Sequence, residues 1–109
     1  MDLSVIEKLY EVVAGRKENY EEGSYTCYLF EKGLDKICKK IGEESAETII
    51  AAKNRNNEEL TLEISDLIYH LIVLMNQAEL PLEAVIDELE KRSQKIGNLK
   101  PTRQTDKNS

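Results

Sequence analysis

Apolar residues in this chain recur every three or four positions, which is the spacing of amphipathic helices. The pattern predicts helices over residues 3–13, 25–32, 34–53, 58–78 and 81–96. No stretch alternates apolar and polar residues as a strand does, and no hairpin dipeptide occurs between the apolar segments. We therefore predict an all-α fold, an antiparallel helical bundle of about five helices.

Residues with strong turn preferences mark the expected helix ends. Gly15 is predicted to end the first helix, Ser24 to cap the start of the second, and Gly33 to end it. Residues 16–23 are polar without an apolar period and are predicted to form an exposed loop. We assign residues 1–97 to one domain and residues 98–109 to a flexible polar tail.

The helix over residues 58–78 carries the broadest apolar stripe. Its members are Leu60, Ile64, Leu67, Ile68, Leu71, Leu74 and Met75. The last helix adds Val85, Leu89 and Ile96 as expected core residues, and Cys27 and Cys38 are interpreted as buried thiols. Because a stripe this wide can face two neighbours and five helices make only a modest core, we expect a homodimer to complete the bundle.

Composition narrows the function classes. The net charge of −6 at pH 7 argues against nucleic-acid binding, which requires a basic surface. No apolar run is long enough for a membrane span, and the first residues lack the layout of a signal peptide, so we expect a cytoplasmic protein without a membrane partner. An acidic protein that acts on a small anionic substrate would need metal ions as counter-charge.

Two pairs of acidic residues suggest such a metal site. Glu44 and Glu47 are three residues apart, as are Glu63 and Asp66, so each pair shares one face of its predicted helix. Four carboxylates converging from two helices suit a hard divalent cation such as Mg²⁺. The alternative is a solvated acidic face paired with lysines. The metal site is favoured because Glu63 and Asp66 interrupt a strongly apolar helix, where uncompensated charge is costly.

Gly42 lies immediately before the first acidic residues, in the middle of a predicted helix. Glycine there costs about 1 kcal/mol relative to alanine. Either close approach of a ligand or neighbouring helix, or a break in the helix, would account for it.

The sequence Glu43-Glu44-Ser45-Ala46-Glu47, followed by Glu63-Ile64-Ser65-Asp66, resembles the EExxE…ExxD signature of the all-alpha nucleoside triphosphate pyrophosphohydrolases, the MazG-like and dimeric dUTPase-like enzymes. Residues 24–26, 39–44, 50–52 and 66–71 further resemble the phosphoribosyl-ATP pyrophosphohydrolase family. The resemblance implies a dimeric helical enzyme with magnesium at each site. It also implies the second step of histidine biosynthesis, hydrolysis of phosphoribosyl-ATP to phosphoribosyl-AMP and pyrophosphate.

On this hypothesis Glu44, Glu47, Glu63 and Asp66 bind magnesium. Either Glu43 or Glu47 accepts the proton of the attacking water, and the sequence does not choose between them.

Further residues are candidates for substrate binding. Basic side chains suited to phosphate are Lys39, Lys40, Arg16, Lys32 and Arg92. His70, four residues after Asp66, is a candidate for substrate contact or a structural histidine. Ser24, Tyr25 and Thr26 are candidates for the nucleotide pocket, although capping and packing also explain them.

Two other functions fit the same pattern. One is a housecleaning nucleotide pyrophosphatase that acts on dUTP or non-standard nucleotides with the same metal site. The other is a non-catalytic helical adaptor, whose acidic pairs are surface charge and whose apolar stripe binds a partner helix.

Overall fold

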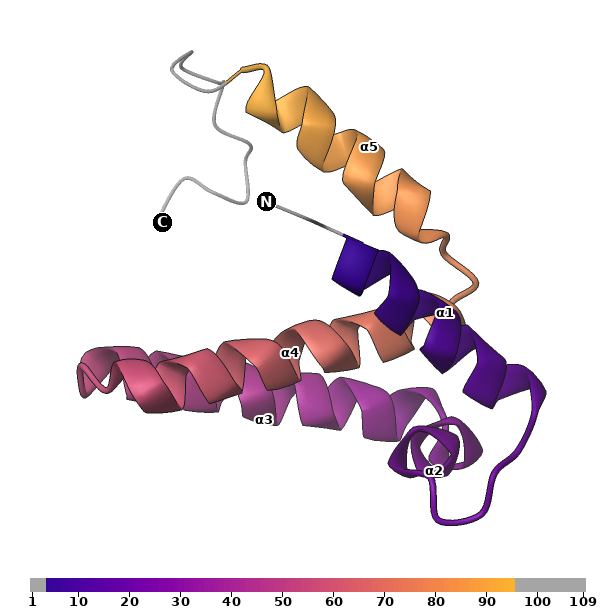
Figure 1. Ribbon diagram of the computed structural model, residues 1–109. Helices are drawn as coiled ribbons and strands as arrows, with labels where there is room; N and C mark the ends of the chain where they lie inside the picture. The colour runs from indigo at the N-terminus through magenta and orange to yellow at the C-terminus, as the bar shows by residue number, and fades with distance from the viewer. Residues whose placement is uncertain (1–3, 96–109) are drawn as a thin grey trace.

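The computed structural model describes residues 4–95, and in that range it contains five helices and no strand. The helices are α1 (Ser4–Glu18), α2 (Tyr25–Lys32), α3 (Leu34–Lys53), α4 (Asn57–Gln77) and α5 (Leu82–Ser93). Helices α3 and α4 form a long antiparallel hairpin, α1 crosses α4, and α2 lies at the end of the hairpin near the start of α3 (Figure 1). The predicted all-α class is confirmed.

Local capping sets the ends of α2 and α4. The Ser24 side chain accepts a hydrogen bond from the backbone N–H of Cys27 at 3.1 Å, and Gly33 at φ 93° ends α2. Asn56 caps α4 by accepting from the N–H of Glu59 at 3.1 Å. Arg55 adopts φ 55°, a left-handed conformation that reverses the chain between α3 and α4.

The prediction that Gly15 ends the first helix is wrong. Helix α1 continues to Glu18, so the connection to α2 is shorter than the loop predicted over residues 16–23. Arg16 and Lys17 in the last turn favour this extension, because cations stabilise a helix C-terminus. Lys17 also donates from Nζ to the carbonyl oxygen of Asn76 at 2.8 Å, which holds the added turn against α4.

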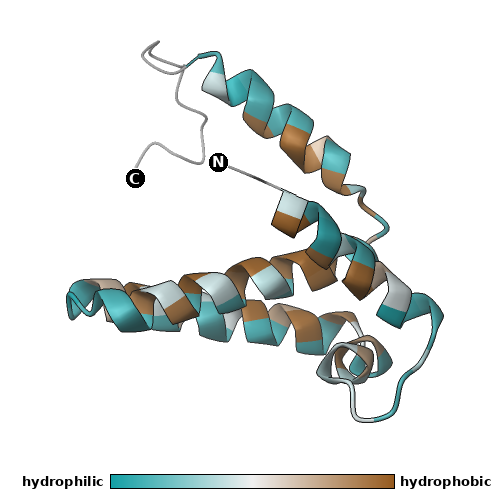
Figure 2. Ribbon diagram, viewed as in Figure 1, coloured by the Kyte–Doolittle hydropathy of each residue, from teal (hydrophilic) through white to brown (hydrophobic). Residues whose placement is uncertain are grey.

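The core lies where α1, α2, α3 and α4 meet. Its most buried side chains are Val13, Leu29, Ile37, Ile72 and Val73. Figure 2 shows that apolar residues continue along α4, and several of them are exposed in this chain. The core therefore uses only part of the apolar surface that the sequence provides.

The broad apolar stripe predicted on α4 is only partly internal. Ile64, Ile68 and Leu71 are 42%, 39% and 38% exposed. Ile72 and Val73, which the predicted stripe omits, are the α4 residues in the core. Helix α4 thus presents one face to α1 and α3 and leaves a second apolar face uncovered within the chain.

Two other burial predictions are wrong. Cys27 is buried as expected, but Cys38 is exposed, because Ile37 takes the inward position on this turn of α3. Leu89 is 56% exposed, because α5 turns away from the α3–α4 hairpin and only Leu82 at its start is buried (Figure 1). Ile96 and the predicted tail over residues 98–109 lie outside the described residues.

No helix within residues 4–95 is long and apolar enough to cross a membrane.

Candidate active site

Carboxylates from α3 and α4 converge on the hairpin. Glu44 on α3 and Glu63 and Asp66 on α4 each place one oxygen so that all three atoms lie within 4.8 Å of one another. The three-residue spacing turns Glu63 and Asp66 to the same face of α4. The antiparallel packing of the two helices then sets Glu44 opposite them.

Two oxygens of this cluster are buried without a partner. Glu44 Oε2 and Glu63 Oε2 have no hydrogen-bond donor, and Glu44 as a whole is only 7% exposed. Buried polar atoms are nearly always satisfied, so such a pair calls for an explanation. A cation between the two carboxylates would provide it.

Lysines do not neutralise the cluster. None of Glu44, Glu47, Glu63 and Asp66 takes part in the ion pairs found within residues 4–95, which include Arg16–Glu21, Lys40–Glu43 and Arg92–Glu88. The alternative prediction, an acidic face paired with lysines, therefore does not describe these four side chains.

The close approach of like charges perturbs two of the carboxyl groups. The neighbouring Glu47 carboxylate, to which protonated Glu63 can donate, is the main cause that raises the pKa of Glu63 to about 7, and burial and Glu44 add to it. Burial is the largest cause of the raised pKa of Glu44, and repulsion from Glu47 and Asp66 raises it further. Glu47 thus belongs to the cluster electrostatically, although its oxygens lie outside the closest group of three.

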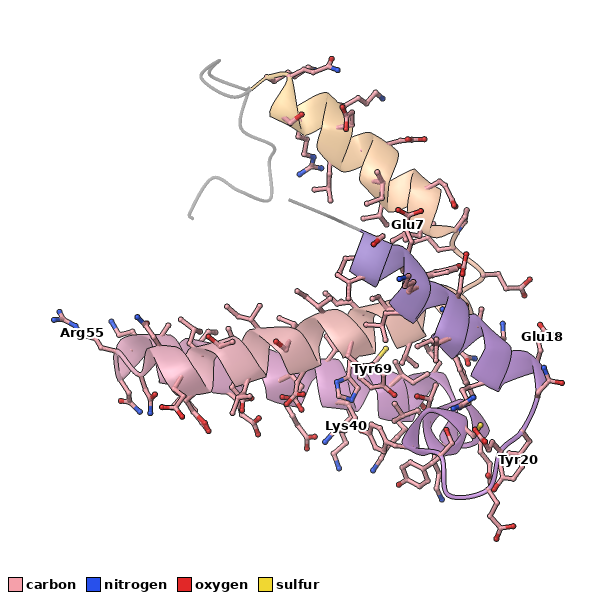
Figure 3. All side chains as sticks on the ribbon, viewed as in Figure 1. Glu7, Glu18, Tyr20, Lys40, Arg55 and Tyr69 are labelled. Carbon is pink, nitrogen blue, oxygen red and sulfur yellow. The ribbon has the colours of Figure 1, made fainter. Side chains whose placement is uncertain are left out.

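Glu43 lies beside this cluster and is held by a lysine. Lys40 Nζ lies 3.3 Å from Glu43 Oε1, and this hydrogen bond raises the pKa of Lys40. Glu43 is an exposed residue, and Lys40, labelled in Figure 3, extends from α3. Lys40 therefore lies next to the carboxylates and keeps a positive charge at their edge.

His70 connects α2 to the acidic face of α4. Its Nδ1 lies 2.8 Å from the carbonyl oxygen of Asp66 and must donate to it, since a carbonyl oxygen only accepts. In the neutral ring Nε2 then accepts, at 3.0 Å, from the hydroxyl of Tyr25. Both ring nitrogens are satisfied, and His70 is only 4% exposed, so the structure places it as a buried link between the two helices.

Other candidates have structural partners, and two lie away from the carboxylates. Ser24 caps α2, and Thr26 hydrogen-bonds the hydroxyl of Tyr69. Arg16 pairs with Glu21 at 2.9 Å, at the far end of α1, and Arg92 pairs with Glu88 on α5, which diverges from the hairpin (Figure 1). This single chain brings neither arginine to the acidic cluster.

Lys39 and Lys32 differ from Lys40 in their surroundings. Lys39 is exposed, and Lys40, its neighbour in sequence, is the one beside the cluster. Lys32 lies with its ammonium 5.8 Å from the centre of the Tyr28 ring.

Neither a helix break nor the close approach of a neighbouring helix of this chain accounts for Gly42, and close approach of a ligand stays a prediction. Helix α3 runs through it without a break, and a Cβ added there would meet no atom within 4 Å. No neighbouring helix of this chain requires glycine at that point.

Sequence reasoning missed three residues: Tyr28 and Tyr69, whose rings stack on Tyr25, and Lys36, whose ammonium lies over the Tyr28 ring. The signal available for Lys36 was its spacing, because Lys36, Lys40 and Glu44 recur every four residues on one face of α3. No sequence pattern pointed to Tyr69, whose position depends on how α2 packs on α4.

A helical hairpin with carboxylates converging between its two arms is suited to an all-helical hydrolase that uses a divalent cation. The profile of the phosphoribosyl-ATP pyrophosphohydrolase family matches residues 6–93. The chain belongs to this family.

Individual relatives agree. The phosphoribosyl-ATP pyrophosphatase of Clostridium novyi is 56% identical over 102 residues, covering 94% of this chain and 93% of the relative. That of Listeria innocua is 56% identical over 92 residues, covering 84% of this chain and 88% of the relative. The histidine biosynthesis bifunctional protein HisIE of Bacillus subtilis is 52% identical over 92 residues, which cover 84% of this chain and 44% of that protein.

Proposed function

We propose that this chain hydrolyses phosphoribosyl-ATP to phosphoribosyl-AMP and pyrophosphate, the second step of L-histidine biosynthesis. Family membership and relatives named phosphoribosyl-ATP pyrophosphatase support the substrate. The observation that carries the chemistry is the cluster of Glu44, Glu63 and Asp66, with one oxygen of each within 4.8 Å of the others and with Glu44 Oε2 and Glu63 Oε2 buried without hydrogen-bond donors.

Magnesium fits this set of residues. Glu44, Glu47, Glu63 and Asp66 offer only oxygen atoms, which hard divalent cations prefer, and Glu44 Oε2 and Glu63 Oε2 have no hydrogen-bond partner. Bound there, magnesium would neutralise the triphosphate and lower the pKa of the attacking water. The four carboxylates hold the site in place from two helices packed against each other.

The proton of the attacking water needs an acceptor, and two residues are candidates. Glu43 lies outside the close cluster and is oriented by Lys40 at 3.3 Å, so its carboxylate is not required for metal binding. Glu47 lies beside Glu63. It can both bind the metal and accept the proton only if one of its oxygens stays uncoordinated. Replacing each with glutamine separates them, because loss of the base lowers kcat with unchanged magnesium affinity, whereas loss of a ligand lowers both.

We assign Lys40, Tyr25 and His70 to the substrate side of this site. Lys40 keeps a cation next to the acidic cluster, where the phosphates of the nucleotide would lie. Tyr25 is 45% exposed, so its ring is available to a nucleotide, while its hydroxyl is fixed by His70 at 3.0 Å. His70 acts through Tyr25 and is a positioning residue.

We also propose that two copies of the chain form a homodimer through the uncovered face of α4. Ile64, Ile68 and Leu71 repeat at helical spacing and are each more than a third exposed. An apolar stripe on a central helix is typical of a surface buried in an oligomer. Multi-angle light scattering that gives the mass of one chain at micromolar concentration would exclude the dimer.

The decisive experiment is incubation with phosphoribosyl-ATP and Mg²⁺, followed by detection of pyrophosphate and phosphoribosyl-AMP. Asp66→Asn should remove most turnover while the circular dichroism spectrum stays helical. Glu58→Gln, an exposed acid in the first turn of the same helix, is the matched control and should keep full activity. Turnover of dUTP with none of phosphoribosyl-ATP would refute the substrate, and wild-type activity in Asp66→Asn would refute the site.

A further inference from the structure

Two lysines converge on one tyrosine near the start of the hairpin. The ammonium of Lys32 lies 5.8 Å from the centre of the Tyr28 ring, and that of Lys36 lies 5.9 Å from it. Within residues 4–95 neither lysine forms an ion pair with a carboxylate. Neither ammonium group therefore has a carboxylate counter-charge in this part of the chain, so a phosphate that contacts them would be stabilised.

A row of aromatic rings connects these lysines to the acidic cluster. Tyr28 stacks on Tyr25 with centroids 6.0 Å apart, and Tyr25 stacks on Tyr69 at 6.2 Å. Tyr25 also bonds His70, which lies one turn after Asp66 on α4. Tyr25 and Tyr28 are 45% and 39% exposed, so the row presents ring surface that a flat base can contact.

The lysines and carboxylates also share one face of α3. Lys36, Lys40 and Glu44 follow one another at four-residue spacing. At 1.5 Å per residue, Lys36 lies about 12 Å along the helix from Glu44. The face is thus basic at one end, acidic at the other, and bordered by the aromatic row.

We propose that Lys32 and Lys36 bind the phosphate of the phosphoribosyl group, while the triphosphate lies at the carboxylate cluster, whose four acids would hold the magnesium that neutralises it. This inference rests on the proposed function, because it uses the chemistry of that substrate. Phosphoribosyl-ATP carries a triphosphate at one end and a single phosphate at the other, separated by a purine and two riboses. The two ends therefore need two separate binding sites on the protein. The purine lies over Tyr25 and Tyr28, between the lysines and the carboxylate cluster. Lys32 and Lys36 select this substrate over ATP, because ATP has no phosphoribosyl group and therefore no phosphate at that end.

The test is the double variant Lys32→Gln/Lys36→Gln, assayed with phosphoribosyl-ATP and Mg²⁺. Loss of charge-assisted phosphate contacts should raise KM at least about tenfold and leave kcat little changed. Ribose 5-phosphate should inhibit the wild type competitively and the double variant at least about tenfold more weakly. ATP as a competitive inhibitor should bind both proteins equally. Lys91→Gln on α5, an exposed lysine away from the hairpin, is the control for charge alone.

The outcomes separate this inference from the proposed function. A wild type that releases no pyrophosphate from phosphoribosyl-ATP overturns both. An active wild type with an unchanged KM in the double variant overturns only the phosphate site. Equal losses of kcat and of magnesium affinity, measured by calorimetry, also overturn it, because the lysines would then support the carboxylate cluster rather than the phosphate.

Discussion

The hydrogen bond between Tyr25 and His70 offers a direct test of how α2 is held on the hairpin. Tyr25→Phe removes the hydroxyl that donates to Nε2 of His70 at 3.0 Å and leaves the rest of the ring. His70 is 4% exposed, so water has little access to the acceptor left behind. An unsatisfied buried acceptor costs about 1–3 kcal/mol. In a domain of this size each kcal/mol lowers Tm by about 4–8 °C, so we expect a fall of about 4–24 °C.

The assay is thermal unfolding followed by circular dichroism, without metal and at one pH. Tyr28→Phe is the matched control, because Tyr28 lies on the same helix and no hydrogen bond of its hydroxyl is found within residues 4–95. It should leave Tm within about 2 °C of the wild type. Equal changes in the two variants, or none in Tyr25→Phe, would refute the reasoning that His70 depends on Tyr25.

Four further results are expected. Glu47→Gln should remove most turnover with unchanged circular dichroism, and full activity in a steady-state assay would contradict its assignment. Because the folded state raises the pKa of Glu63 from its ordinary 4.5 to about 7, the folded protein binds more protons than the unfolded chain between these values. The metal-free protein should therefore lose stability as pH rises from about 5 to about 8, and a pH series of melting curves in Glu63→Gln should show a smaller loss. Ile68→Glu should shift the light-scattering mass from two chains to one, unless α4 is not the dimer surface. Leu29→Ala, at a site with 0% exposure, should cost about 2–5 kcal/mol in urea unfolding, and a loss below 1 kcal/mol would remove Leu29 from the core.

The helices could be predicted from the sequence because periodicity and caps act locally. Ser24 and Gly33 bound α2 as expected, and each involves bonds within a few residues. The prediction that Gly15 ends the first helix is wrong because glycine destabilises a helix by only about 1 kcal/mol relative to alanine. The hydrogen bond from Lys17 to α4 outweighs this cost. That contact joins residues distant in the sequence, so no local pattern reveals it.

The sequence predicts that the two acids of each pair share one face of a helix. It does not predict that the two pairs meet. Three-residue spacing places Glu63 and Asp66 on one side of α4 in any helix. Their approach to Glu44 depends on the register of the hairpin, which the turn at Arg55 sets. The partners of Lys36 depend on the angle at which α2 packs, and that angle has no sequence signature.

The apolar spacing on α4 likewise predicts that these side chains are shielded from water. It does not predict whether this chain or a second copy covers them. The stripe on α4 included Ile64, Ile68 and Leu71, which this chain leaves exposed, and omitted Ile72 and Val73, which it buries. Both sets repeat at helical spacing, so choosing the internal one requires knowing where α1 lies.

The two buried, unpartnered oxygens of Glu44 and Glu63 bear on how this protein would respond to engineering. A search for thermostable variants in metal-free buffer would favour neutral replacements at both positions, since each relieves like-charge repulsion. Those same replacements would discard the ligands on which the proposed reaction depends. Selection for stability and selection for turnover would therefore favour different residues at Glu44 and Glu63. A screen has to include the cation if it is to find variants that are both stable and active.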